Sequence, residues 1–357
     1  MGLVRPPLPR AAPLDDARPA TDAWTPLVSV IVVARNEEAH IGACLEGILR
    51  QDYPHDRLEV VVVDGMSEDR TGEVLAGFTR RAVPIRVLPN PAQQRAHGLN
   101  LGIQAARGEV ICRIDARTRI DPTYVSSCLR TMQATGAAAV GAAMRPIWAT
   151  PTQEAIALVM SHPLGVGNTQ FRLGRKSGFV DIIYLGLYRR EMFDRVGLFD
   201  EAPAIISEDT DLQYRIRRAG GTIYLNAGIP VYYQPRENFL GLWRLCFRYG
   251  GGLAGYVLKH RRFGAWRRLA APALVLALVG LSAGAVVDRR LVWPLAVLIG
   301  VYLAATVGVS TAVAITRRKM ALLGRVCLAF LCMHLGRGCG FWWRLLQRPK
   351  PGTYWDH

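Results

Sequence analysis

The chain has 357 residues, half of them hydrophobic, and a formal net charge of +16 at pH 7. This length and apolar content allow a sizeable core and predict one large folded domain together with a further region. Seven cysteines without a CxxC pair argue against a zinc site or a disulfide framework, and they suit a reducing compartment.

The N-terminal segment, residues 1–22, is rich in Pro, Ala and Arg and lacks an apolar stretch. We predict a disordered tail there, because a signal peptide or a membrane span needs an apolar core.

From Val28 onward, short apolar runs alternate with segments of helical periodicity. Alternation of this kind predicts an α/β domain with a parallel sheet and crossover helices. The apolar residues of the strand runs are continuous rather than alternating, which indicates that helices cover both faces of the sheet. The predicted strands are residues 28–33, 58–64, 85–88 and 110–115, and the helical segments are 37–51, 67–81 and 92–108.

The second half of the soluble part is less regular. Residues 161–201 are predicted to form a loop region, and an acidic turn then opens a helix over residues 206–221. Gly220 and Gly221 end this helix as C-cap residues do, and a strand follows over residues 222–225.

The C-terminal region, residues 269–343, is predicted to be membrane-associated. Residues 269–287 and 291–316 are uncharged and close to the roughly 20 residues that a spanning helix needs. Residues 320–343 are apolar but contain Arg325, His334 and Arg337, so this segment either spans or lies in the interface. An amphipathic basic segment, residues 238–268, leads into the membrane, and residues 344–357 form a tail.

The basic residues predict the orientation. They flank the two clean spans on their outer sides, whereas only Arg289 and Arg290 lie between the spans. The positive-inside rule therefore places the N-terminal domain on the cytoplasmic face of the cell membrane, as part of a multi-pass protein. Membrane headgroups account for the positive charge, and we predict no nucleic-acid partner because the sequence contains no recognised nucleic-acid module.

Acidic residues stand at the ends of predicted strands or in loops: Asp64, Asp115 and the pair Glu208/Asp209. Any one of them can be a helix cap. Several carboxylates at the same sheet edge repel one another unless cations or hydrogen-bond donors bind there. They predict a ligand with hydroxyl groups, a metal ion, or both.

Over Val28 to Gly252 the sequence resembles the inverting family 2 glycosyltransferases, which have a GT-A nucleotide-sugar-binding (Rossmann-like) fold. The opening "VSVIVVARNEEAHIGACLEGILRQDYP", the turn "VVVDGMSEDRT" and the segment "AHGLNLGIQAARGEVICRIDAR" match family motifs in order. The segment "ISEDTDLQYRIRRAG" resembles the one that supplies the catalytic base. Within the family, "VDIIYLGLYRREMFDRVGLFDE" and "FRYGGG" are most similar to the membrane-attached enzymes of succinoglycan-type polysaccharide synthesis.

The resemblance implies roles for particular residues. Glu37 and Asp64 would contact the nucleotide base and ribose, and Arg95 the base or the diphosphate. Asp115 matches the first acid of the Asp-x-Asp element, near the ribose and the metal-bound diphosphate. Asp209 matches the base that deprotonates the acceptor hydroxyl, with Glu208 beside it.

The sequence departs from the family pattern at Arg117, where many members have the second Asp of Asp-x-Asp. A guanidinium cannot ligate Mg²⁺ or Mn²⁺, which prefer hard oxygen ligands. We favour a retained divalent cation held by Asp115, the diphosphate and water. The alternative is that Arg117 supplies part of the positive charge, or lies on the surface.

Arg236, Arg244 and Arg248 are candidates for contact with the diphosphate and acceptor, because arginine pairs bidentately with phosphate oxygens. The Gln-x-x-Arg-Trp element of processive synthases is absent from the sequence. We therefore expect transfer of a single sugar.

These observations predict a hexosyltransferase that moves one sugar from a nucleotide sugar, a UDP-sugar above all, to a lipid-linked glycan in cell-surface polysaccharide synthesis. One alternative is direct transfer onto polyprenyl phosphate. Another is a non-catalytic membrane scaffold with a degenerate transferase fold, but such a scaffold has no need of Asp64, Asp115 and Asp209 together. A transporter is disfavoured because the clean spans contain no internal ionisable residue.

Overall fold

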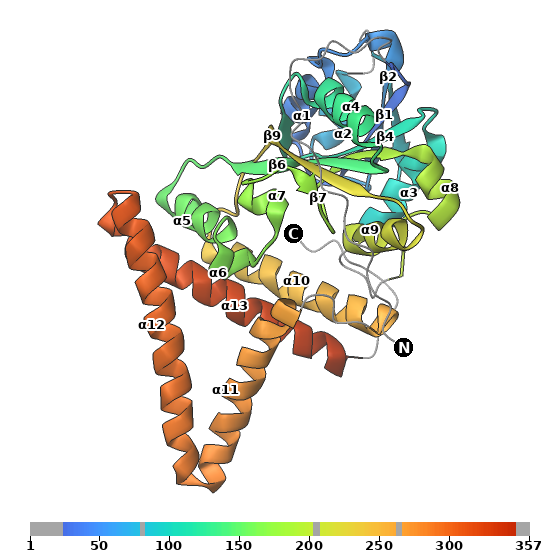
Figure 1. The fold of residues 1–357 in the computed structure, drawn as a ribbon. Helices are drawn as coiled ribbons and strands as arrows, with labels where there is room; N and C mark the ends of the chain where they lie inside the picture. Colours follow the sequence, from blue (N-terminus) through green and yellow to red (C-terminus); the bar gives the residue numbers. More distant parts are fainter. Residues whose placement is uncertain (1–23, 79–82, 203–207, 262–265, 348–357) are drawn as a thin grey trace.

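The computed structural model describes residues 24–78, 83–202, 208–261 and 266–347 (Figure 1). The tail predicted for residues 1–22, and residues 348–357 of the predicted C-terminal tail, lie outside these ranges.

The first half of the domain is the predicted α/β alternation. Strands β1 to β4 are parallel, in the order β3-β2-β1-β4, and the predicted strand runs are correct to within a residue. The β-branched residues of β1 and β2 are nearly all buried, as expected of strands covered on both faces. The elements are β1 Val28–Ala34, α1 Ile41–Leu49, a 3₁₀ turn His55–Arg57, β2 Leu58–Asp64, α2 Thr71–Ala76, β3 Ile85–Pro89, α3 Arg95–Ala105 and β4 Val110–Asp115.

The second half makes the sheet mixed. Its order continues from β4 through β8, β6 and β9 to β5, with β8 antiparallel to both neighbours. The elements are β5 Thr118–Ile120, α4 Tyr124–Thr135, β6 Ala139–Pro146, α5 Pro151–Met160, α6 Pro163–Val166, α7 Gln170–Leu173, β7 Gly178–Phe179, β8 Gly186–Arg189, α8 Arg190–Val196, α9 Glu208–Arg218 and β9 Ile223–Tyr233.

Residues 161–201, predicted as a loop region, contain α6, α7, β7, β8 and α8, so that prediction was wrong in part. Strand β8 is only four residues long, yet it occupies a central place in the sheet. Its apolar run is too short to be distinguished from loop by periodicity. The predicted helix end is confirmed, since Gly220 has a φ of 85° just beyond α9.

Apolar residues cover both faces of the sheet. Helices α1, α2 and α4 pack on one face, and helices α3, α8 and α9 pack on the other. The carboxyl ends of the parallel strands are therefore supported by a hydrophobic core on each face of the sheet.

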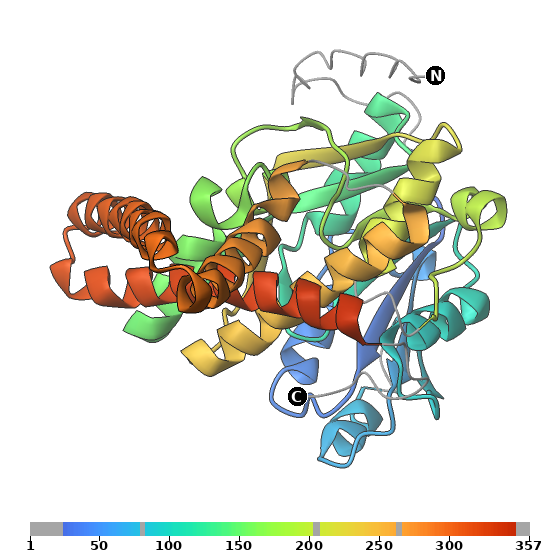
Figure 2. The same cartoon turned by 90° about the horizontal axis from the view of Figure 1, so that it is seen from below.

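Four long helices follow the sheet: α10 Phe239–His260, α11 Ala270–Val287, α12 Val292–Thr316 and α13 Leu323–Leu346, with 3₁₀ turns at Trp266–Leu269, Arg289–Leu291 and Met320–Leu322. Among the described residues, three helices are long and apolar enough to cross a membrane, those containing α11, α12 and α13. Helices α11 and α12 form a hairpin that projects from the domain (Figure 1). Seen from below, α13 runs beside α10 under the domain (Figure 2).

Candidate active site

The carboxyl ends of β1, β2 and β4 bring the predicted acidic residues to one edge of the sheet. Asp64 pairs in register with Ala34, and Asp115 pairs with Val33. The loops that follow β1 and β2 are joined by hydrogen bonds, because Asn36 N donates to Ser67 Oγ at 2.9 Å and Glu37 N donates to Thr71 Oγ1 at 2.8 Å. The two family-like turns thus form one surface.

Asp64 shapes its own turn. Its carboxylate accepts hydrogen bonds from the Ser67 hydroxyl, at 2.5 Å, and from Ser67 N, at 3.2 Å. Met66 inside this turn has a φ of 58°, a conformation that a non-glycine residue adopts at some cost. Asp64 caps no helix, since α2 begins only at Thr71, but these hydrogen bonds hold its carboxylate at the strand end.

Asp115 lies at the centre of a polar cluster. Its Oδ1 is ion-paired with Arg95, which comes from the start of α3, and its Oδ2 accepts a hydrogen bond from the Tyr184 hydroxyl at 3.0 Å. Burial raises the pKa of the Asp115 carboxyl, but the charges of Arg95 and Arg113 and the hydrogen bonds outweigh it and lower the pKa to about 2. Asp115 is therefore an anion at neutral pH.

Arg113 joins Asp115 to the acidic pair on α9. Its guanidinium is ion-paired with Asp209, and its Nη2 lies 3.4 Å from both Glu208 Oε1 and Asp115 Oδ1. Arg95 also approaches Glu208, with 3.4 Å between Nε and Oε1. Only 3% of the Arg113 side chain is exposed, so these charges interact in a poorly hydrated place. Arg113 of β4 thus connects Asp115, at the end of its own strand, to Glu208 and Asp209 at the start of α9.

Sequence reasoning missed Arg113 and Tyr184. A signal for Arg113 was present, since an arginine inside the otherwise apolar strand "VICRID" needs a buried anionic partner. Tyr184 carries no comparable signal, because it lies in the region predicted as loop. Burial and the adjacent Asp115 raise the pKa of the Tyr184 hydroxyl, which therefore keeps its proton and donates a hydrogen bond to Asp115.

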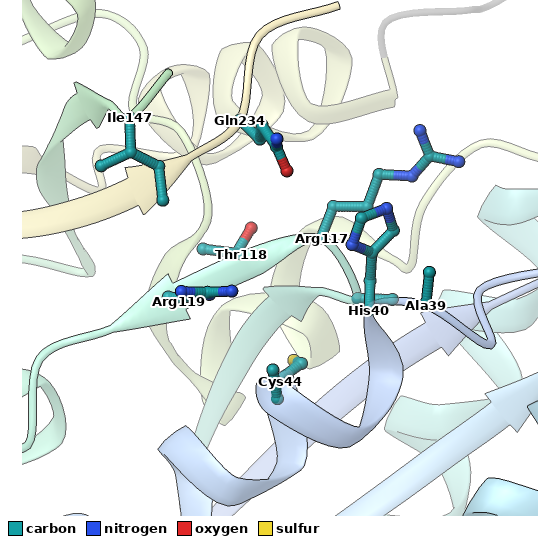
Figure 3. A pocket seen from close by; sticks show the side chains of 10 residues that line it. Ala39, His40, Cys44, Arg117, Thr118, Arg119, Ile147 and Gln234 are labelled. Carbon is teal, nitrogen blue, oxygen red and sulfur yellow. The ribbon is translucent and has the colours of Figure 1, made fainter. Parts of the chain in front are cut away.

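Glu37 and Arg117 lie together at a second part of the edge. Arg117 Nε is 2.8 Å from Glu37 Oε1, and the Arg117 side chain is half exposed. Arg117 and His40 stand at a small pocket that Gln234 also lines (Figure 3). Burial, and then the charges of Arg117 and Arg248, lower the pKa of Arg236. Arg117, Arg236 and Arg248 thus lie near enough for their charges to interact, whereas Arg244 is exposed on α10.

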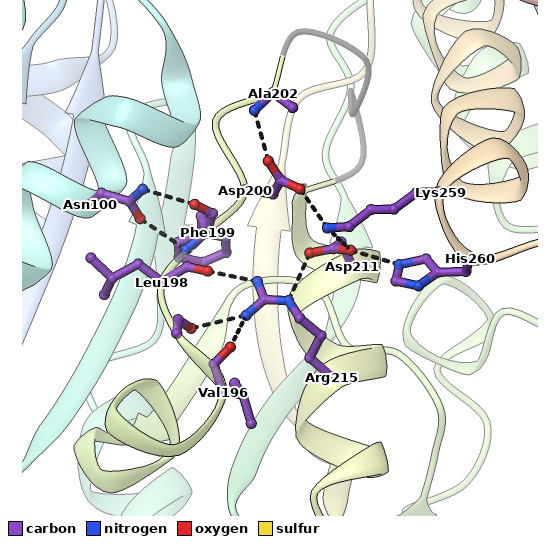
Figure 4. Close-up of polar contacts among 11 residues, drawn as sticks. Asn100, Val196, Leu198, Phe199, Asp200, Ala202, Asp211, Arg215, Lys259 and His260 are labelled. Carbon is purple, nitrogen blue, oxygen red and sulfur yellow. Dashed lines mark hydrogen bonds and ion pairs between the residues drawn. The ribbon is translucent and has the colours of Figure 1, made fainter.

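A buried carboxylate links α9 to α10, and the sequence analysis did not single it out. Asp211 accepts from Lys259 Nζ and His260 Nε2, each at 2.7 Å, and from Arg215 Nε at 2.9 Å (Figure 4). Burial raises the pKa of Asp211, but hydrogen bonds from these three partners outweigh it and lower the pKa. The helix that carries Asp209 is in this way fixed to the end of α10.

A metal cage made by the protein alone is not found in the described part of the chain, where no three His, Cys, Asp or Glu side chains are grouped to hold an ion. A cation held by one carboxylate, substrate phosphates and water is the other common arrangement for Mg²⁺. Asp115 fits it through Oδ2, which accepts one hydrogen bond, from Tyr184, and keeps a further lone pair, whereas Oδ1 faces both Arg95 and Arg113.

Known proteins resemble this chain in sequence and in fold. The family model described as glycosyl transferase family 2 matches residues 29–197. The succinoglycan biosynthesis protein ExoA of Rhizobium meliloti is 30% identical over 92% of this chain and 98% of its own length. A dolichyl N-acetyl-alpha-D-glucosaminyl phosphate 3-beta-D-2,3-diacetamido-2,3-dideoxy-beta-D-glucuronosyltransferase of Methanococcus voltae is 24% identical, over 62% of this chain and 71% of its own.

Among solved structures, the mannosyltransferase PcManGT of Pyrobaculum calidifontis, in complex with GDP-Man and Mn²⁺, superposes with a TM-score of 0.58. The match covers 89% of this chain and 90% of that one at 21% identity. At this identity the likeness concerns the fold alone, and it confirms the GT-A architecture expected from the sequence.

Proposed function

The chain belongs to glycosyltransferase family 2, and from this premise we propose that it transfers one sugar, with inversion, from a UDP-sugar to a lipid-linked glycan during cell-surface polysaccharide synthesis. The proposed catalytic domain is residues 23–237, on the cytoplasmic face of the cell membrane. Two relatives support the acceptor by their names: one belongs to succinoglycan biosynthesis and the other acts on a dolichyl-linked sugar.

The observation that carries the proposal is the cluster in which Arg113 and Arg95 hold Asp115, Glu208 and Asp209 together. A donor bound at the edge made by Glu37, Asp64 and Asp115 would place its reactive sugar carbon between that edge and α9. Asp209, which begins α9 with Glu208, is our proposed general base.

In the proposed reaction, Asp209 takes the proton of the acceptor hydroxyl as that oxygen bonds to C1 of the sugar. The bond between C1 and the phosphate oxygen breaks, and its electron pair leaves with the nucleotide diphosphate. Attack from the face opposite the diphosphate inverts C1 in one step, so no covalent enzyme intermediate forms. Arg113 keeps the base oriented, and Glu208 lies beside it.

Charge developing on the diphosphate must be offset. Arg117, Arg236 and Arg248 gather near the site although like charges repel, which supports a role in binding phosphate. Arg244 lies one turn before Arg248 on α10 and is our further candidate for contact with the acceptor. A divalent cation, Mg²⁺ or Mn²⁺, would supply further positive charge when bound, with Asp115 as its protein ligand.

Product analysis tests the proposal. Membranes containing the protein are incubated with labelled nucleotide sugars and a native lipid extract. Mild acid then releases the labelled glycan from its lipid carrier for analysis. One labelled sugar at the end of a longer glycan, with an inverted anomeric linkage, is the expected result. A product with a single sugar on polyprenyl phosphate would replace the proposed acceptor, and a retained configuration would contradict the mechanism.

A further inference from the structure

Helix α13 has the length of a membrane span, about 36 Å for 24 residues, but its contacts place it elsewhere. From these contacts we propose that the chain crosses the membrane twice, through α11 and α12, and that α13 lies along the cytoplasmic surface of the bilayer beside α10. The C-terminus is then on the same side as the catalytic domain.

The two ends of α13 meet the two ends of the hairpin that share one side of the membrane. Its N-terminal end follows α12 directly, through the turn Met320–Leu322. Near its C-terminal end, Trp342 Nε1 donates to Pro272 O at 2.8 Å, in the first turn of α11. Because α11 and α12 are antiparallel neighbours joined by a short turn, the start of α11 and the end of α12 lie at the same membrane surface. A helix that joins these two points does not cross.

One face of α13 is covered by the catalytic domain. Phe330 and Met333 are fully buried in a core with Ile156 and Val159 of α5. Lys319, just before α13, is 2.9 Å from the buried carboxylate of Glu154 on the same α5. This core fixes the N-terminal half of α13 to the soluble domain.

Polar groups in the middle of α13 are also bonded to that domain. His334 Nε2 lies 2.9 Å from Leu164 O, and Arg337 Nη1 donates to Gly165 O at 2.8 Å. His334 also contacts the middle of α12, with 3.0 Å between its Nδ1 and the Tyr302 hydroxyl, so this part of α13 borders the hairpin as well as the domain. If α13 spanned the membrane, His334 and Arg337 would stand near the centre of the bilayer, where ionisable groups are costly.

The backbones of α10 and α13 are in direct contact at glycines, so the two helices pack as a unit. A Cβ on Gly250 would collide with the Arg337 carbonyl, and one on Gly340 would collide with the Phe247 carbonyl. Leu328, Trp343 and Leu346 of α13 remain exposed, as suits a helix against lipid. By contrast, α11 and the N-terminal half of α12 expose most of their apolar side chains, and the charged residues Asp288 to Arg290 stand at their tip; Thr306, Ser310 and Ala314, in the other half of α12, are buried.

Arginine distribution favours the same topology. With two crossings, Arg344, Arg348 and Lys350 stay on the side that already holds Arg267 and Arg317. A third crossing would carry them to the opposite side, against the positive-inside rule.

Tags in sealed bacterial membrane vesicles test the proposal. One protease-cleavable tag follows His357, and another is inserted between Asp288 and Arg289. In inside-out vesicles, we expect protease to remove the C-terminal tag together with the catalytic domain and to leave the loop tag protected; in right-side-out vesicles the pattern reverses. A matched control carries an added 20-residue leucine-rich span after Gln347, which moves its C-terminal tag to the opposite side.

A C-terminal tag protected in inside-out vesicles would overturn the proposal, because α13 would then cross. A loop tag cleaved from the cytoplasmic side would overturn it as well, because the hairpin would not cross. Topology is read without sugar transfer, so a failure of the transferase proposal leaves this result interpretable.

Discussion

Replacing Arg113 by Gln removes the cation that three carboxylates share. The side chain is 3% exposed and pairs with Asp209, Glu208 and Asp115. Breaking a buried pair by removing one partner costs about 3–5 kcal/mol, because the remaining charge is left uncompensated. At about 2–4 °C per kcal/mol for a domain of this size, we expect the midpoint of thermal unfolding to fall by roughly 10 °C.

The matched control is Arg117→Gln. This arginine makes one ion pair, with Glu37, and its side chain is 52% exposed. Exposed pairs contribute about 0–1 kcal/mol, so the midpoint should fall by no more than about 4 °C. Both variants are melted in the same detergent, with loss of intrinsic fluorescence as the readout. Equal shifts for the two variants would refute the buried-cation reasoning.

A conservative variant separates positioning from folding. Arg113→Lys keeps the charge but loses the planar fork that reaches several carboxylates. If Arg113 orients Asp209, kcat should fall about 100-fold, since small misplacements of a catalytic group have effects of that size. The KM for the donor should stay within a few-fold of wild type. An unchanged kcat in a stable Arg113→Lys protein would remove Arg113 from the mechanism.

Other predictions follow from the same contacts. Asp211→Asn should destabilise the protein by about 1–3 kcal/mol in thermal melts, because the buried Asp211 carboxylate is the shared anionic partner of Arg215, Lys259 and His260, while Asp194→Asn on the exposed face of α8 should have no measurable effect. The lowered pKa of Asp115 contributes stability that is complete above about pH 4 and is lost as pH falls toward 2; Asp115→Asn should remove that part of the acid dependence, and an identical acid profile would contradict it. Excess EDTA should abolish sugar transfer and Mg²⁺ or Mn²⁺ restore it, whereas full activity in EDTA would show that arginines suffice.

Local patterns predicted the parallel half of the sheet well. Strands β1 to β4 are mainly apolar, each with one polar or charged residue inside its run, and turn residues follow each of them. The acidic residues at their ends were predictable for the same reason, since parallel strands place their carboxyl ends at one edge. Strand β8 was missed because it owes its place to pairing with β4 and β6, which are distant in sequence.

The site was predictable residue by residue but not in its connections. Asp115 and Asp209 follow from motifs, whereas their common partner Arg113 depends on how α9 returns to β4. The sequence did not decide, for a similar reason, whether the segment that forms α13 crosses the membrane or lies at its surface. An apolar helix of that length can either cross a membrane or pack against protein, and only the contacts of Phe330 and His334 with the domain distinguish the two.

The most direct test of the central claim compares Asp209→Asn with wild type and with Asp194→Asn in membranes. Release of nucleotide diphosphate is measured over a panel of nucleotide sugars, with native lipid extract as acceptor, and donor binding is measured in parallel. Loss of the general base should lower kcat by about 10²–10⁴-fold while donor binding and the Asp194→Asn enzyme stay unchanged. An Asp209→Asn protein that turns over its donor at the wild-type rate would contradict the assignment of Asp209 as the base.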